Sequence, residues 1–168
     1  DGRMMSELGQ MIGVDNSAPM LHMYKERLDK RPHGENVRLV CGRMEDIGLK
    51  NASVIVMNLA LQFIPLAHRD GMIQSVWDAL VPSGILLITE KTIQTHDDFT
   101  QLYQDFYYRF KKENGYSNLE ISQKRDALEN VLIPETVETH VDRFRKAGFS
   151  RIEIWQKWFN FTSFICRK

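Results

Sequence analysis

The chain has 168 residues, and its 22 Lys and Arg residues balance 22 Asp and Glu residues, so its formal net charge is zero. A neutral chain has no overall attraction to nucleic acid or to an anionic membrane surface, and its apolar runs are far shorter than the roughly 20 residues that a membrane-spanning helix needs. Because 43% of the residues are hydrophobic, the composition predicts one globular domain over residues 1–168, with no direct nucleic-acid or membrane partner.

The predicted elements of the first half alternate between strand and helix. The chain starts at Asp1 rather than Met, and Asp1, Gly2 and Arg3 lead directly into a helical pattern, so we expect that sequence precedes residue 1. Apolar runs predict buried strands, and amphipathic stretches predict helices. In chain order these are the end of a helix at 4–8, a strand at 11–14, a helix at 19–30, strands at 37–41 and 53–59, a helix at 68–80 and a strand at 85–89. This alternation is typical of a parallel sheet covered by helices.

The second half begins with consecutive helices at 97–112 and 118–131, with no strand between them. They form a predicted helical insert at 97–131. A third helix is expected at 134–147, with Pro134 in its first turn and Gly148 after its end. Two strands follow, at 151–158 and 161–167. The connection between them is too short for a crossover helix, so they are expected to pair antiparallel.

This order of elements predicts an α/β protein with the Rossmann-like class I methyltransferase fold, a mostly parallel sheet closed by an antiparallel C-terminal hairpin. Asp15 follows the 11–14 strand, where a carboxylate can accept hydrogen bonds from the ribose of a nucleotide cofactor. Taken alone, Asp15, Asn16 and Ser17 also fit an ordinary strand-to-helix turn. Gly2 resembles the end of a glycine-rich loop, so we expect the first strand and the rest of that loop upstream of residue 1.

Several motifs resemble one family, the carboxy-S-adenosyl-L-methionine synthases, which act in the modification of the wobble uridine of tRNA. The most specific is the stretch NGYSNLEISQKRDALENV at 114–131. Shorter motifs that fit the same family are NAS at 51–53, MNL at 57–59, LQF at 61–63, TEK at 89–91, ETH at 138–140 and FNF at 159–161. The resemblance implies that S-adenosyl-L-methionine and prephenate are converted to carboxy-S-adenosyl-L-methionine and phenylpyruvate, without a metal.

The resemblance also assigns roles to individual residues. Asp15 and Asn16 match the pair that binds the ribose, and Asn58, at the end of a strand, matches a cofactor contact. Arg125 matches the arginine that holds the carboxylate of the product, for which its planar guanidinium is well suited. From spacing alone, Arg125 also fits a solvated charge on a helix.

Arg43 and Met44 depart from the family pattern at the adenine site. An acidic residue usually stands at the position of Arg43 and receives the adenine amino group, whereas a guanidinium cannot accept a hydrogen bond. Asp46 is a nearby substitute in a different register. Met44 retains a backbone N–H donor and an apolar wall for the ring.

Other readings of the sequence remain open. A conventional S-adenosylmethionine-dependent methyltransferase, acting on a small molecule or tRNA, would share the fold and Asp15 but would leave Arg125 unexplained. A non-catalytic nucleotide-binding protein would be consistent with Arg43.

The two cysteines, Cys41 and Cys166, fit a reduced cytoplasmic protein, and no Cys or His spacing predicts a metal site. The aromatic residues of the insert predict a homodimer.

Overall fold

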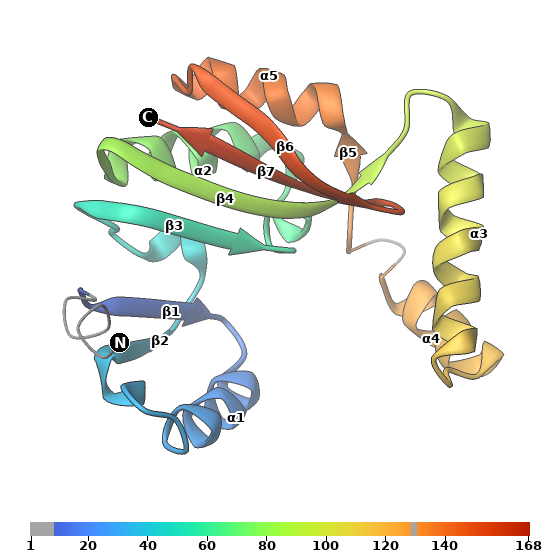
Figure 1. Ribbon diagram of the computed structural model, residues 1–168, viewed down its shortest axis with the longest axis horizontal. Coiled ribbons are helices and arrows are strands. Elements are labelled where there is room, and N and C mark those ends of the chain that lie inside the picture. The colour runs from blue at the N-terminus through green and yellow to red at the C-terminus, as the bar shows by residue number, and fades with distance from the viewer. Residues whose placement is uncertain (1–8, 129–130) are drawn as a thin grey trace. The chain divides into compact units, whose positions relative to one another are not determined.

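The computed structural model describes residues 9–128 and 131–168. The chain divides into two compact units, unit 1 from Asp1 to Gly48 and unit 2 from Leu49 to Lys168. In Figure 1 the described part of unit 1 is blue, and unit 2 runs from cyan to red. Each unit has its own sheet. The expectation of a single domain over 1–168, with a first strand upstream, stays a prediction.

Unit 1 contains a pair of parallel strands joined by a helix. Its elements are β1 (Met11–Asp15), α1 (Ala18–Leu28), η1 (Gly34–Asn36), β2 (Val37–Cys41) and η2 (Met44–Asp46). In the parallel ladder, Met11 lies opposite Val37 and Asp15 lies opposite Cys41. The side chain of Ser17 begins α1 by accepting a hydrogen bond from the Met20 N–H at 3.4 Å, as expected of a helix cap.

Unit 2 contains the larger sheet and the helical insert. Its elements are β3 (Ala52–Asn58), η3 (Leu61–Phe63), α2 (Leu66–Ala79), β4 (Leu80–Ile93), α3 (Asp97–Glu113), α4 (Asn118–Leu128), β5 (Glu135–Thr136), α5 (Val137–Ala147), β6 (Arg151–Trp158) and β7 (Phe161–Arg167). The strand order is β3-β4-β7-β6, with β5 paired to the end of β4. β3 and β4 are parallel, whereas β7 is antiparallel to both β4 and β6. The predicted antiparallel hairpin is therefore confirmed.

The two faces of this sheet differ in burial. Along β4, Leu86, Ile88, Glu90 and Thr92 are fully buried, and the residues between them are only half-buried. On the buried face, Phe164 of β7 packs against the rings of His140 and Phe144 of α5. Helices α2 and α5 contact each other on this side (Figure 1). The core of unit 2 thus lies between the sheet and these two helices.

The start of β4 differs from the sequence prediction. The strand begins at Leu80 rather than at residue 85, although Pro82 and Gly84 indicate a turn. Both are accommodated by a bulge, because β4 advances five residues (80 to 85) while β3 advances two (52 to 54). Ser83 in the bulge has a positive φ of 65°. The turn residues at 81–84, which by local preference separate the 68–80 helix from the strand, thus form an interruption within the strand.

The prediction that Pro134 lies in the first turn of the third helix was wrong. Residues 135 and 136 are extended and pair with Thr92 and Ile93 of β4. Thr136 then caps α5, because its hydroxyl accepts a hydrogen bond from the Thr139 N–H at 3.2 Å. Strand pairing with β4, which local sequence cannot show, delays the start of the helix by three residues, from 134 to 137.

The helices of the predicted insert are present as α3 and α4; residues 129–130 of the 118–131 prediction lie outside the described residues.

Candidate functional site

The first candidate residues lie where β1 and β2 of unit 1 end. Asp15 is the last residue of β1, and its carbonyl oxygen accepts a hydrogen bond from the Gly42 N–H at 3.0 Å, so the residues following both strands lie together. One carboxylate oxygen of Asp15 accepts the Ser17 N–H at 2.7 Å, which fixes the side chain at the turn. Asp15 and Asn16 are both exposed. An exposed carboxylate held in this way can also accept hydrogen bonds from a diol.

Arg43 and Met44 follow β2 at the same end of unit 1. Arg43 precedes the short helix η2, and its guanidinium donates a hydrogen bond to Glu45 at 3.0 Å. This bond raises the pKa of Arg43 and directs its charge toward a neighbouring carboxylate. Met44 is half-buried. Gly2, the remaining residue expected in this region, lies outside the described residues.

In unit 2, Asn58 ends β3 beside a cavity of about 310 Å³. Asn58 is opposite Thr89 in the parallel ladder, and both residues line the cavity. The remaining lining residues come from the loop after β3, from α3 and from the C-terminal hairpin: Leu59, Tyr107, Gln156, Trp158, Phe161 and Ser163. A cavity outside the carboxyl ends of parallel strands is the usual position of a ligand site in α/β proteins.

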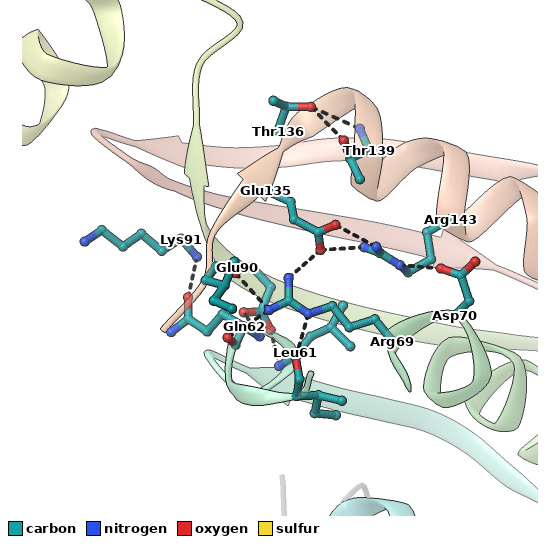
Figure 2. Close-up of polar contacts among 12 residues, drawn as sticks. Leu61, Gln62, Arg69, Asp70, Glu90, Lys91, Glu135, Thr136, Thr139 and Arg143 are labelled. Carbon is teal, nitrogen blue, oxygen red and sulfur yellow. Dashed lines mark hydrogen bonds and ion pairs between the residues drawn. The ribbon is translucent and has the colours of Figure 1, made fainter. Parts of the chain in front are cut away.

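A buried carboxylate holds the backbone that follows Asn58. Leu59 has a positive φ of 53°, and its N–H donates to the carbonyl oxygen of Thr89 at 2.7 Å. The next three N–H groups all donate to the carboxylate of Glu90, from Ala60 at 3.1 Å, Leu61 at 2.8 Å and Gln62 at 3.1 Å. Figure 2 shows Leu61 and Gln62 turned toward Glu90. Burial raises the pKa of Glu90 to about 7, and the three backbone donors oppose that rise.

Arg69 connects this loop to the segment before α5. Its side chain is fully buried and donates to the carbonyl oxygens of Gln62 and Ile133 at 2.9 Å and of Ile64 at 2.8 Å. It also pairs with the carboxylate of Glu135, which Arg143 holds through two further hydrogen bonds (Figure 2). The guanidinium groups thus fix the path of the loop after β3.

The structure places Arg125 on α4, exposed to solvent and paired with Asp126 at 3.0 Å. Arg125 and Asn58 belong to unit 2, whereas Asp15, Asn16, Arg43 and Met44 belong to unit 1. The structure therefore brings together the candidates that follow the strands of unit 1, whereas in unit 2 Asn58 ends β3 and Arg125 lies on α4. The roles of all these residues stay predictions.

Relatives with known names share most of this chain. A carboxy-S-adenosyl-L-methionine synthase from Desulforapulum autotrophicum is 54% identical over 158 residues, which cover 94% of this chain and 64% of that protein. A protein of the same name from Actinobacillus pleuropneumoniae is 43% identical over 95% of this chain and 66% of its own length. The chain belongs to the carboxy-S-adenosyl-L-methionine synthase family. It spans about two thirds, or slightly less, of the length of these relatives.

Residues 2–84 of this synthase-family chain also match the family model described as a methyltransferase domain. The structure of an O-methyltransferase family protein from Burkholderia thailandensis is similar, with a TM-score of 0.70 and 15% identity over 99% of this chain and 45% of that one. At this identity the likeness concerns the fold alone. The predicted Rossmann-like class I methyltransferase fold is thus confirmed.

Sequence reasoning missed Arg69, Glu135 and Arg143. In this family member Arg69 holds the loop after β3, and Glu135 and Arg143 are joined to Arg69 by ion pairs and hydrogen bonds. A signal was present, because Arg69 lies on the same helical face as Met72, Ile73 and Val76, where a charged residue is unexpected. Two further findings apply to the described ranges only. No three His, Cys, Asp or Glu side chains there gather closely enough for a metal ion, and no helix there is long and apolar enough to cross a membrane.

Proposed function

We propose that the protein containing this chain is a carboxy-S-adenosyl-L-methionine synthase. It converts S-adenosyl-L-methionine and prephenate to carboxy-S-adenosyl-L-methionine and phenylpyruvate, in the cytoplasm and without a metal, and so supplies wobble uridine modification of tRNA. The observation that carries the proposal is the 54% identity to a protein of that name over 94% of this chain.

The strand ends of unit 1 support a role in binding S-adenosyl-L-methionine. Asp15 presents an exposed carboxylate that suits the ribose diol, with Asn16 beside it. Met44 offers a half-buried apolar surface to the adenine ring. The family resemblance implies a further cofactor contact for Asn58, at the end of β3 in unit 2. We propose that Arg43 is accommodated at the usual acidic position because its charge is directed to the carboxylate of Glu45. Gly2 completes the proposed set.

Arg125 is proposed to hold the carboxylate that distinguishes the product from S-adenosyl-L-methionine. Asp126, with which it forms an ion pair, is itself a carboxylate, and both side chains are more than half exposed. An exposed ion pair contributes little free energy, so a carboxylate ligand can replace Asp126 at small cost. A guanidinium forms two parallel hydrogen bonds to such a ligand.

We also propose a homodimer that uses the helical insert. Four apolar side chains at helical spacing on α3, Phe99, Leu102, Phe106 and Phe110, are 38–48% exposed. A second copy of the chain would cover such a surface. The protein is proposed to bind no nucleic acid directly, in keeping with its zero net charge.

The test is the product formed by the full-length protein, including any residues that precede Asp1. Incubation with S-adenosyl-L-methionine and prephenate should give the carboxylated cofactor and phenylpyruvate, as measured by mass spectrometry. Methyl transfer to an added substrate, with demethylated cofactor and no carboxylated product, would favour the conventional methyltransferase. Absence of any nucleoside from the purified protein, together with no turnover, would favour the non-catalytic alternative.

The Arg125→Ala variant tests the role that separates the synthase from a methyltransferase. Affinity for the carboxylated cofactor should fall by roughly one to three orders of magnitude, while affinity for S-adenosyl-L-methionine changes little. Arg125→Lys should recover only part of the loss, because a point charge does not reproduce the planar fork. Arg109→Ala, which removes another exposed arginine of the insert, is the matched control. Equal losses for both ligands would contradict the assignment.

A further inference from the structure

The cavity beside Asn58 has a polar row on its sheet face. The strand register aligns Asn58 with Thr89, Thr89 with Ser163, and Ser163 with Gln156, so one polar residue comes from each of four neighbouring strands. All four line the cavity, and the hydroxyls of Thr89 and Ser163 are 2.8 Å apart. Such a row offers hydrogen bonds to a ligand that lies across the strands.

A row of aromatic residues lies next to the polar one. Phe161 is aligned with Trp158 in the hairpin, two residues along from Ser163. Tyr107 of α3 packs edge-on against both, with ring centroids 5.1 Å from Phe161 and 6.2 Å from Trp158. These three rings, which also line the cavity, form an apolar wall suited to a flat six-membered ring.

Two lysines stand at this wall. Lys91 is aligned with Phe161, so it lies on the same face of β4 as Thr89, two residues further along. In Figure 2 its side chain extends away from the network around Glu90. The ammonium group of Lys111, one helical turn after Tyr107 on α3, lies 4.8 Å from the centre of the Tyr107 ring.

The two ammonium groups are close enough to repel each other. Burial lowers the pKa of Lys91, and the charge of Lys111 lowers it further. Burial also lowers the pKa of Lys111, with a further contribution from Lys124, the residue before Arg125 on α4. In the described ranges, neither Lys91 nor Lys111 forms an ion pair with a carboxylate. Two partly buried cations without carboxylate partners favour binding of an anion between them.

We propose that this cavity binds the second substrate, a carboxylate-bearing six-membered ring, and that Lys91 and Lys111 hold its carboxylates. This inference rests on the proposed function, which supplies prephenate as that substrate. The ring lies against Tyr107, Trp158 and Phe161, and its polar substituents face the row that begins at Asn58. A cavity of about 310 Å³ is at the small end of the range for ligand sites, which suits a single-ring acid.

The experiment measures the two substrates separately in Lys91→Gln and Lys111→Gln variants of the full-length protein. The KM for prephenate, from initial rates, and the Kd for phenylpyruvate, from calorimetric titration, should each rise about tenfold or more. The reason is the loss of a charged hydrogen bond to the ligand. The Kd for S-adenosyl-L-methionine should stay within about twofold of the wild type. Lys111→Arg should retain most of the affinity. Lys112→Gln, at an exposed neighbouring position, is the matched control and should behave like the wild type.

The possible outcomes separate this inference from the proposed function. Unchanged phenylpyruvate and prephenate binding in both Lys→Gln variants would overturn the inference, as would an equal loss in Lys112→Gln. An equal loss of S-adenosyl-L-methionine binding would also overturn it, since that would indicate a general effect on the fold. If the wild type makes no carboxylated product but binds phenylpyruvate through Lys91 and Lys111, the site stands and the proposed function fails.

Discussion

Glu90 and Lys91 are adjacent charged residues on β4 that point to opposite faces of the sheet. Glu90 is fully buried and accepts hydrogen bonds from three successive backbone N–H groups. Lys91 is half-buried beside aromatic rings and near a second ammonium group. The buried face has internal partners for its charges, so it fixes the loop after Asn58. The opposite face leaves cations for a ligand, which makes that face suitable for binding.

Among substitutions that test the difference between the two faces, Arg69→Met, on the buried face, should have the largest effect on stability. The substitution removes the donor to three backbone carbonyl oxygens and one partner of Glu135, so the free energy of unfolding should fall by about 3 kcal/mol or more. Urea unfolding measures the change. Arg109→Ala, which breaks only an exposed pair with Glu113, should cost less than about 0.5 kcal/mol. Similar losses in both variants would contradict the distinction between buried and exposed charges.

Glu90→Gln tests whether burial controls the protonation of the carboxylate. The folded pKa of about 7 exceeds the ordinary value of 4.5, so the folded state binds the proton more tightly and the contribution of Glu90 to stability falls as pH rises from 4.5 to 7. Over this window the wild type should lose about 3 kcal/mol relative to the variant, which cannot titrate at this position. Urea unfolding of both proteins at several pH values measures the difference. A difference that does not vary with pH would exclude the raised pKa.

His140→Leu should give the opposite pH dependence on the same buried face. Burial lowers the pKa of His140 from 6.5 to about 4, and its ring nitrogens have no hydrogen-bond partner among the described residues. The unfolded state therefore binds the proton more tightly, and the contribution of His140 to stability is lost as pH falls from 6.5 to 4. The wild type should lose up to about 3 kcal/mol relative to the variant over that range. Thermal unfolding of both proteins at pH 4.5 and 7 is the measurement. A stability difference between wild type and variant that is the same at both pH values would contradict the lowered pKa of His140.

The smallest effect on stability is expected for Lys91→Gln, on the opposite face. Removing a partly buried cation that is repelled by Lys111 should change the free energy of unfolding by less than about 1 kcal/mol, with any change in the stabilising direction. Differential scanning calorimetry of the protein without ligand is the measurement. A loss comparable to that of Arg69→Met would mean that Lys91 supports the fold rather than a ligand.

Much of the fold was predictable from the sequence because the signals are local. Apolar runs marked β1, β2 and β3, and the short connection at 159–160 required the antiparallel hairpin. The start of β4 and the strand β5 were not predictable, because each depends on pairing with a distant segment. By local preference Pro82 favours a turn and Pro134 the first turn of a helix, and strand pairing overrides that preference in both cases.

The candidate site could be predicted only where a residue follows a strand. Asp15 was predicted from its position after a strand, whereas the contact of Asn58 was implied by the family resemblance. The structure has both residues at strand ends. The neighbours of Lys91, namely Phe161 and Lys111, could not be predicted, because they depend on the register of β4 with β7 and on the position of α3. The TEK motif contains both Glu90 and Lys91, but the sequence does not show which of the two charges has internal partners.

The position of β7 has a consequence for how the protein is made. β7 lies inside the sheet, between β4 and β6, yet it is synthesised after every other described strand. While the chain emerges from the ribosome, the edge of β4 that will receive β7 therefore stays open until residues 161–167 have been released. A premature stop in this short segment would leave both β4 and β6 without their shared neighbour. The codons for residues 161–167 thus decide whether the unit folds or exposes an unpaired strand edge to aggregation.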